Sequence, residues 1–472
     1  MGVQRVTHDS KFQLQKYAAE RFDNCDGISC LPNHILVVIL SSLPLKEAGR
    51  TSVLSSRWKN LWQQTSRLNF DASSALVKIA RDYKLDSEEG REYVRWVNSV
   101  LKSLPSKQAL TLEHFKICFG IRKAWYGTIT KWLEFAFERR VEKLELQLQP
   151  YKIDYDQLEN KYVFPEDILF RNSSDIPHHS TTLFNFNSLK ELCLTYVSIS
   201  DEGIKFFLCN CSLLEQLVLE DVNQLSNLEV CGASLVLKRL YVMYCSDLVS
   251  IKVSAPNLTS LAVMEKNELV FESVLMLESV PMLVDLDILC RREKIPLLAP
   301  ALFCCFSQLK ILTLRLQTYK ACAIVWFKFP EMHGLKKLVV ILRTTYDETL
   351  IGLMTFIRIS PNLEELVLKV TLFSGLALGR REVNEGTPFP HQHLKVLKYL
   401  GYHGHGSDLD VVKFISENCV RLQQIIIGTA KPLDLSHRPP HPANSKYEQV
   451  RRSYAKQQLE PIILPHITFT IL

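Results

Sequence analysis

The sequence of 472 residues contains no apolar run long enough to cross a membrane. A membrane-spanning helix needs about 20 consecutive, mostly apolar residues, and no segment of the chain comes near that length. The N-terminal residues are polar and lack the apolar core of a secretory signal. We therefore expect a flexible tail over residues 1–26 and no membrane partner.

Regularly spaced cysteines are also missing. The 13 cysteines are scattered along the chain, and no Cys-x-x-Cys pair occurs. A secreted disulfide framework or a structural zinc site normally shows a fixed cysteine spacing. The pattern predicts free thiols in a reducing compartment, the cytoplasm or the nucleus.

The motifs of common enzymes are absent as well. The chain has neither of the phosphate-binding patterns GxxxxGK[ST] and GxGxxG, and it has no GxSxG or HExxH motif. Four histidines lie close together in the sequence without a patterned carboxylate or thiolate partner, namely His391, His393, His403 and His405. We expect these to be solvated loop residues, and we expect no metal, no cofactor and no catalytic residue.

Charge of one sign is not concentrated anywhere in the chain. The formal net charge is +6 and the pI is about 8.6, with basic residues spread along the whole sequence. Nucleic-acid-binding domains instead gather their basic residues in a patch or stripe. No nucleic-acid partner is expected.

Against this background, an apolar segment stands out at residues 31–62. Pro32 suits the first turn of a helix, and Pro44 ends that helix because proline cannot continue one. Between the two prolines, large apolar residues follow a helical spacing along one broad stripe, namely Ile35, Leu36, Ile39, Leu40 and Leu43.

Two further short helices are predicted in the same segment. One covers residues 45–53, and Ser55 or Ser56 is expected to cap the other, which carries Trp58, Leu61 and Trp62. Three short helices of about 40 residues have too little interior to bury so many apolar groups among themselves. The surplus either caps the end of a larger domain or docks a separate protein.

After this segment, the chain repeats one short phrase. An apolar residue is followed by two variable positions, an apolar residue, one variable position and another apolar residue. The phrase returns every 21–31 residues, apart from one interval of 48 residues between Leu144 and Leu192. Its middle positions are Phe115, Leu144, Leu192, Leu217, Leu240, Leu261, Leu286, Leu312, Leu338, Leu366, Leu397 and Ile425.

A period in the twenties with this phrase is the signature of leucine-rich repeats. Each phrase predicts a short strand, and residues 162–164 predict a degenerate strand inside the long interval. The returning segments are expected to be short helices, with Asp201 and Asp408 as N-caps. The expected helices cover residues 92–104, 127–139, 201–215 and 408–423. Because each unit must stack on its neighbours to bury its core, a solenoid is predicted.

The segment at residues 31–62, LPNHILVVILSSLPLKEAGRTSVLSSRWKNLW, closely resembles the F-box of plant F-box proteins with leucine-rich repeats. One departure is Asn33-His34, where that family usually has an acidic pair. Residues 361–428 resemble the FBD region that ends many of these proteins, and residues 373–390 are expected to form an exposed loop within it.

The resemblance implies an α/β fold, with a small three-helix F-box followed by an α/β leucine-rich-repeat solenoid (a horseshoe). The expected domains are a tail at 1–26, the F-box at 27–71, repeats at 72–360, the FBD-like last repeats at 361–430 and an extension at 431–472.

The resemblance also implies a function without catalysis. The F-box would dock a Skp-type adaptor and, through it, a cullin–RING ubiquitin ligase, while the repeats would bind an unknown target protein. The expected adaptor-binding residues are Leu31, Pro32, Ile35, Leu36, Ile39, Leu40, Leu43, Pro44, Val53, Leu54, Ser55, Arg57, Trp58, Leu61 and Trp62. The alternative is a leucine-rich-repeat binding scaffold with a degenerate F-box outside any ligase.

Overall fold

The computed structural model describes residues 28, 30–81, 86–105, 111–120, 122–150, 161–170, 184, 186–264, 274–291, 302–318, 330–344, 354–372, 390–429 and 445–472. Two compact units divide the chain. Unit 1 comprises Met1–Tyr155 and Thr182–Asn185, and unit 2 comprises Asp156–Thr181 and Phe186–Leu472. The predicted tail at 1–26 and residues 373–389 of the predicted loop lie outside the described residues.

Unit 1 begins with the helical segment that the two prolines delimit. Helix α2 spans Asn33–Ser41 and helix α3 spans Leu45–Arg50, each directly preceded by a proline. Helix α3 continues into a 3-10 turn, η1 (Thr51–Val53), as the predicted span of 45–53 requires. The first two predicted helices are therefore confirmed.

The third predicted helix is shorter than expected and has 3-10 geometry. Residues 56–60 form turns, and a 3-10 helix, η2 (Leu61–Gln64), follows them. The backbone N–H groups of Trp58 and Leu61 bond to carbonyls three residues earlier, at 3.1 and 3.2 Å, which is the 3-10 pattern and not the α pattern. Tight turns still bring the apolar residues of this segment to one side.

The rest of unit 1 is the start of the repeat array. Strands β1 (Arg67–Asp71), β2 (His114–Cys118) and β3 (Lys143–Gln147) pair in parallel, with Leu68, Phe115 and Leu144 in register. The helical elements between them are α4 (Ser73–Arg81), α5 (Asp86–Ser103), the 3-10 turn η4 (Lys123–Trp125) and α6 (Tyr126–Glu138). Helices α5 and α6 cover the predicted helices at 92–104 and 127–139 except for the last residue of each.

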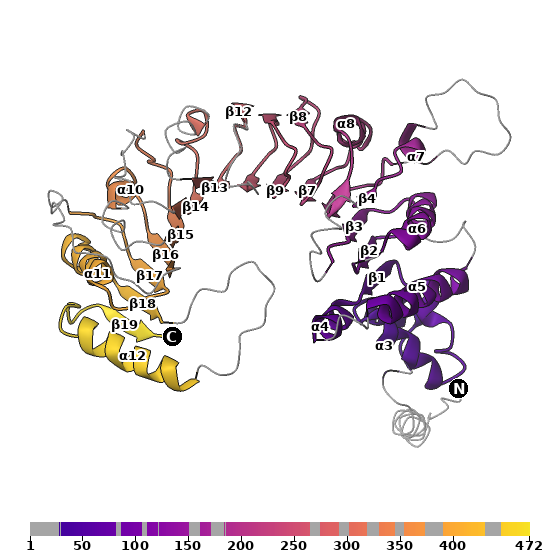
Figure 1. Ribbon diagram of the computed structural model, residues 1–472, viewed down its shortest axis with the longest axis horizontal. Coiled ribbons are helices and arrows are strands. Elements are labelled where there is room, and N and C mark those ends of the chain that lie inside the picture. Colours follow the sequence, from indigo (N-terminus) through magenta and orange to yellow (C-terminus); the bar gives the residue numbers. More distant parts are fainter. Residues whose placement is uncertain are drawn as a thin grey trace, which may run out of the picture. The chain divides into compact units, whose positions relative to one another are not determined.

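The helical segment is packed onto this array within unit 1. Leu45 and Ala48 of α3 are buried, and α3 contacts β1. The Lys46 ammonium lies 4.4 Å from the ring centre of Trp96 in α5, a cation–π contact. Part of the surplus apolar surface is therefore used as a cap on the repeats (Figure 1).

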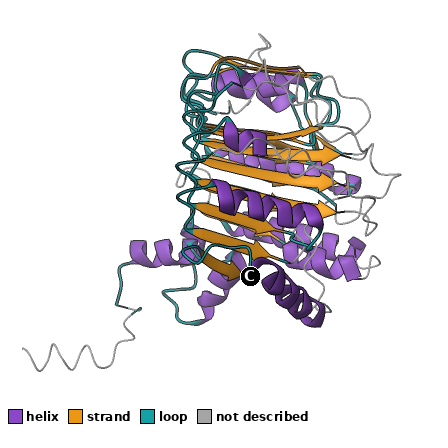
Figure 2. Ribbon diagram, turned by 90° about the vertical axis from the view of Figure 1, so that its left-hand side faces the viewer, coloured by secondary structure: helices purple, strands orange, loops and turns teal. Residues whose placement is uncertain are grey.

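Unit 2 contains a long ladder of parallel strands. The leucines of the repeated phrase lie opposite one another from strand to strand, as in the series Leu192, Leu217, Leu240, Leu261 and Leu286. In order, its strands are β5 (Glu191–Thr195), β7 (Gln216–Glu220), β9 (Arg239–Met243), β11 (Ser260–Met264), β13 (Asp285–Arg291), β14 (Ile311–Thr318), β15 (Lys337–Thr344), β16 (Glu365–Leu372), β17 (Val396–Leu400), β18 (Gln424–Gly428) and β19 (Thr468–Ile471). Figure 2 shows such strands side by side with their arrows pointing the same way. The predicted repeat register is confirmed.

The strands of unit 2 follow a curve, and the other elements lie on its outer side (Figure 1). These elements include helices α7 (Asp167–Phe170), α8 (Asp201–Asn210), α10 (Met354–Arg358), α11 (Gly406–Asn418) and α12 (Ser445–Leu459). A second parallel sheet consists of β8 (Asn227–Cys231), β10 (Ser250–Ser254) and β12 (Val274–Ser279).

The second sheet corrects the expectation that all returning segments are helices. The repeats that it belongs to are among the shortest, so an extended return fits where a helix does not. Its strands also alternate between buried and exposed residues, as in β8, where Leu228 and Val230 are buried while Asn227 and Glu229 are exposed. That period of two is typical of a strand with one buried face.

Two further details differ from the prediction. Tyr162–Val163 is a strand, β4, as expected, but it pairs with β6 (Val197–Ser198) outside the main ladder. The N-cap of α8 is Ser200, whose hydroxyl accepts the Gly203 N–H at 3.1 Å, while Asp201 instead accepts the Ser226 N–H. The Asp201 carboxylate thus binds a backbone segment 25 residues away and does not cap its own helix, which a rule based on local sequence cannot predict.

The predicted N-cap Asp408 lies inside α11. His405 is the N-cap of α11, and Asp408 takes the third helical position, where its carboxylate accepts backbone N–H groups, including that of His405 at 3.1 Å.

The C-terminal extension completes the ladder. After α12, strand β19 pairs in parallel with β18, so that Phe469 lies opposite Ile425. The sequence pattern missed this last strand because it lacks the leucine phrase.

Candidate protein-binding surfaces

Helix α2 has one side that packs into the helical segment. Leu36 and Leu40, one turn apart, are almost fully buried. They form a small core with Ala48, Trp58 and Leu61, and Leu31, Val37 and Trp62 pack around it. This core is complete without any contribution from the opposite side of α2.

The opposite side of α2 carries exposed apolar residues. Ile35, Val38 and Ile39 follow the helical i, i+3, i+4 spacing, and Leu43 lies four residues beyond Ile39. Val38 is 64% exposed, and Val53 after α3 is 87% exposed. We call Ile35, Val38, Ile39 and Leu43 the α2 stripe. Large apolar side chains grouped in this way indicate a surface for binding another protein.

The structure divides most of the predicted adaptor-binding residues into an exposed group and a buried group. Leu31 and Trp62 belong to neither, because both are half-buried. The exposed group is Pro32, Ile35, Ile39, Leu43, Pro44, Val53, Leu54, Ser55 and Arg57, and the buried group is Leu36, Leu40, Trp58 and Leu61.

Trp58, one of the expected adaptor-binding residues, does not face outward. Only 5% of Trp58 is exposed, because its ring packs against α2. An acidic substitution at Leu36 would disrupt the core, so it cannot report on docking. Sequence reasoning also missed Val38, although its spacing of three residues from Ile35 was a usable signal.

The unusual Asn33 has a defined role in the segment. Arg57 Nε donates to Asn33 Oδ1 at 2.8 Å, and the same guanidinium donates to the Leu31 carbonyl. These bonds tie the turns after α3 to the start of α2. A neutral amide therefore accepts here what a carboxylate would accept more strongly.

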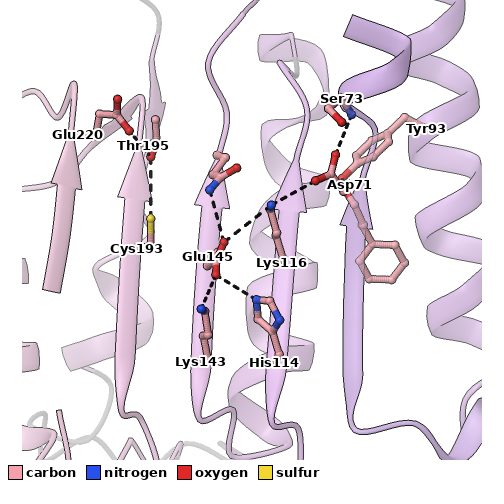
Figure 3. Close-up of polar contacts among 12 residues, drawn as sticks. Asp71, Ser73, Tyr93, His114, Lys116, Lys143, Glu145, Cys193, Thr195 and Glu220 are labelled. Carbon is pink, nitrogen blue, oxygen red and sulfur yellow. Dashed lines mark hydrogen bonds and ion pairs between the residues drawn. The ribbon is translucent and has the colours of Figure 1, made fainter. Parts of the chain in front are cut away.

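In unit 1, the strand face, formed by the alternate residues that do not enter the core, carries a closed charge network (Figure 3). Glu145 lies 3.2 Å from His114 Nε2 and 2.9 Å from Lys143 Nζ, and Lys116 Nζ lies 3.2 Å from Asp71. Burial alone would raise the pKa of Glu145, but the hydrogen bonds from His114 and Lys143 outweigh it and lower the pKa to about 2. Each charge in this network faces an opposite one.

The strand face of unit 2 pairs most of its carboxylates in the same way. Arg315 makes two bonds of 2.8 Å to the Asp287 carboxylate, and Lys337 lies 2.9 Å from Glu365. Glu364 bonds to lysines on both sides, Lys336 at 2.8 Å and Lys395 at 2.7 Å. The carboxylates of Asp287, Glu364 and Glu365 are thus bound to cations of adjacent repeats.

The clustered histidines are structural. His391 is buried, and its Nε2 lies 3.0 Å from the Ser360 carbonyl while its Nδ1 accepts the Leu394 N–H at 3.0 Å. His393 Nδ1 lies 3.0 Å from the Pro361 carbonyl. The expectation of solvated loop histidines is wrong for this pair, because both join adjacent turns of the array. Within the described ranges, no group of three or more His, Cys, Asp or Glu side chains could hold a metal ion.

No helix in the part of the chain that the structure describes combines the length and apolar character that crossing a membrane requires.

Comparison with known proteins identifies the two parts of the chain. The F-box family model matches residues 28–69. The leucine-rich-repeat family model described as "At1g61320/AtMIF1, LRR domain" matches residues 103–454, which is more than half of the chain. The matches therefore cover both the helical segment and the strand ladder.

Individual relatives agree with these matches. F-box/LRR-repeat protein At3g03360 of Arabidopsis thaliana is 33% identical over 41% of this chain and 38% of its own length. FBD-associated F-box protein At4g10400 of the same plant is 26% identical over 85% of this chain and 92% of its own length. Putative F-box/FBD/LRR-repeat protein At5g62970, also from Arabidopsis thaliana, is 32% identical over 42% of this chain and 46% of its own length.

For the first and third relatives, the match spans less than half of the relative's own length. The matches to the family models are independent of how much of each relative is covered. The F-box model matches the helical segment, and the leucine-rich-repeat model matches most of the strand ladder. The chain belongs to the family of F-box proteins with leucine-rich repeats.

Proposed function

We propose that this chain is the substrate-recognition adaptor of a Skp–cullin–F-box ubiquitin ligase. Its F-box docks a Skp-type adaptor, and its repeats bind a target protein for ubiquitination. The chain contributes no catalytic group of its own. Its effect on the reaction is to hold a target lysine near a ubiquitin-charged enzyme, which raises the effective concentration of the two reactants.

The exposed α2 stripe is the observation that carries the proposal. The core of the F-box is filled by Leu36, Leu40 and Trp58, so the stripe has no role in folding the module. Fully burying one aliphatic side chain of this size is worth about 1.5–3 kcal/mol. Several such groups on one helix face therefore supply enough free energy for a specific interface.

A matched pair of valines tests the role of the stripe. Val38 in α2 is 64% exposed and Val249 in unit 2 is 59% exposed. Val38→Asp places a charge on the docking face, whereas Val249→Asp places the same charge on an equally exposed site elsewhere. Valine and aspartate have similar helix propensities, so α2 keeps its structure.

Binding of the full chain to a purified Skp-type adaptor is measured by titration calorimetry. We expect Val38→Asp to weaken binding at least 10-fold and Val249→Asp to change it less than 2-fold. Equal affinities for the two variants would reject the α2 stripe as the docking face. No adaptor binding by the folded wild-type chain would favour a repeat scaffold with a degenerate F-box.

A further inference from the structure

The strand face of unit 2 differs along its length. In β16, Leu366, Leu368 and Val370 enter the core, so Lys369 lies on the opposite, inner side of the curve. In β17, Lys398 lies between the buried Leu397 and Tyr399 and takes the same side. We call Lys369 and Lys398 the lysine pair.

The two lysines are close neighbours. Strand pairing sets Lys398 opposite Val367, two residues before Lys369 on the adjacent strand. With strand spacing of about 4.8 Å and a rise of about 3.3 Å per residue, their Cα atoms lie about 8 Å apart. The two ammonium groups repel each other, since the charge of Lys398 is among the causes that lower the pKa of Lys369.

Neither lysine makes an ion pair or hydrogen bond within the described ranges, whereas the neighbouring cations do. Arg315 is bound to Asp287, and Lys337 is bound to Glu365. Burial is the largest cause that lowers the pKa of Lys369, and Arg315 and Lys398 lower it further, while the Asp287 carboxylate offsets only part of this. The positive charges around Lys369 therefore outweigh the negative charge of Asp287 in the folded chain.

The surroundings of the lysine pair suit a polypeptide better than a nucleic acid. Partly exposed apolar residues share its face, namely Val339, Ile341, Leu400 and Ile426. The carboxylates of Asp287 and Glu365 interrupt the positive charge, and these would repel a continuous phosphate backbone. A peptide can place acidic side chains at the lysines and apolar ones between them.

A tyrosine lies farther along the ladder. Tyr244, directly after β9, is half-buried, and the charges that act on its phenol include Arg315 of β14 and Asp287 of β13. Burial raises the pKa of its phenol, which keeps the hydroxyl as a neutral donor. Tyrosine and arginine are the side chains that binding surfaces favour most.

We propose that the inner strand face over β14–β17 binds an acidic segment of the target protein, with Lys369 and Lys398 contacting its carboxylates. Arg315, which Asp287 holds in place, lies two strands from Lys369 and extends the positive charge. The assignment of this segment to a target rests on the proposed function, in which the repeats present the target-binding surface.

The test uses the full chain and a fluorescein-labelled twelve-residue peptide in which glutamate alternates with alanine (the glutamate peptide), with the same peptide carrying glutamine in place of glutamate (the glutamine peptide) for comparison. Anisotropy is measured at about 0.15 M salt, where exposed charges are screened beyond about 8 Å. We expect the glutamate peptide to bind and the glutamine peptide to bind at least 10-fold more weakly. Equal binding of the two peptides would overturn the proposal.

A charge-matched pair of double variants localises the site. Lys369→Gln with Lys398→Gln removes the lysine pair, while Lys205→Gln with Lys413→Gln removes two positive charges from the outer helices α8 and α11. We expect at least 10-fold weaker glutamate-peptide binding for the first variant and less than 2-fold for the second. Equal losses would show attraction by net charge alone and would contradict the assignment.

Two controls complete the design. Lys369→Arg with Lys398→Arg keeps both charges and should restore most of the binding, which a purely structural role of the lysines would not predict. Oligouridine is titrated as a competitor of the glutamate peptide. If it binds at the lysine pair more tightly than the peptide does, the proposal of a peptide site is wrong and the face binds a nucleic acid. Adaptor binding is measured on the same variants and should not change, so failure here and failure of the ligase proposal remain distinguishable.

Discussion

The F-box and the repeat strands use their apolar residues in opposite ways. Helix α2 buries Leu36 and Leu40 but leaves Val38 and its neighbours exposed, whereas the repeated leucines of the ladder are almost completely buried. The exposed positions of the ladder carry charged residues, most of them paired between strands. The exposed surface of α2 therefore suits an apolar partner, whereas the exposed face of the ladder suits a charged one.

The two strand faces extend this comparison. In unit 1, Asp71, Lys116, Glu145 and Lys143 form a closed network, while in unit 2 neither member of the lysine pair makes an ion pair within the described ranges. Charges that pair with one another within the chain stabilise the fold. Charges without such a pair are available to bind a partner of opposite charge. The following predictions separate residues that hold the fold from residues that are free to bind.

The largest effect is expected at a buried ion pair of unit 2. Lys161 Nζ lies 2.9 Å from Asp221 and 2.6 Å from Asn223 Oδ1, and both members of the ion pair are almost fully buried. Lys161→Met leaves the Asp221 carboxylate buried without its cation, which destabilises a protein by about 3–5 kcal/mol. Urea unfolding of the full chain measures this.

Lys205 provides the exposed counterpart for that test. It lies 3.7 Å from Glu202 on the surface of α8. Lys205→Met should change the free energy of unfolding by less than about 0.5 kcal/mol. Similar losses for the two lysine variants would mean that burial does not distinguish the charges of this array.

The two sides of α2 are expected to respond differently to truncation. Leu36→Ala removes a core side chain and should destabilise the F-box by about 2–5 kcal/mol, whereas Val38→Ala should change its stability by less than about 0.5 kcal/mol. Hydrogen exchange of the backbone amides in residues 31–62 of the full chain measures the local effect. Equal protection in the two variants would contradict the assignment of the α2 core.

A smaller, pH-dependent effect is expected at Glu145. Its pKa in the folded chain, about 2, lies below its ordinary value of 4.5 because the bonds from His114 and Lys143 outweigh burial. The carboxylate therefore stabilises the fold fully above about pH 4.5, and this contribution is lost as the pH falls toward 2.

Glu145→Gln should accordingly lower the free energy of unfolding by on the order of 2 kcal/mol at pH 7. The difference from the wild type should shrink below pH 4.5 and be nearly gone near pH 2. Denaturant titrations at several pH values follow it. A difference that stays constant over this range would place the effect in packing and not in charge.

Much of the fold was predictable because it depends on local periodicity. The phrase with Leu217 or Leu240 alternates at the spacing of a strand, and its return every few tens of residues requires stacked repeats. The second sheet was missed because helices were expected for all returning segments, although β8 alternates as a strand does and its repeats are too short for a helix. The turns around Trp58 likewise depend on the contacts that Arg57 makes with the start of α2.

The candidate surfaces were predictable only in part. Ile35 and Ile39 are one turn apart, and so are Leu36 and Leu40, so sequence spacing does not reveal which pair faces the core. On the strand face of unit 2, Arg315 pairs with Asp287 and Lys337 pairs with Glu365, each 28 positions away in the sequence. Such partners become neighbours only through the ladder register, and for this reason the unpaired Lys369 could not be identified from the sequence.

The central claim is that the α2 stripe docks a Skp-type adaptor, and the most direct measurement replaces Ile39 within it. Ile39→Asp is compared with the wild type in calorimetric titration of the adaptor, with hydrogen exchange confirming that the F-box remains folded. We predict at least a 10-fold loss of affinity with unchanged protection of Leu36 and Leu40. Wild-type affinity in a variant with a folded F-box would contradict the account.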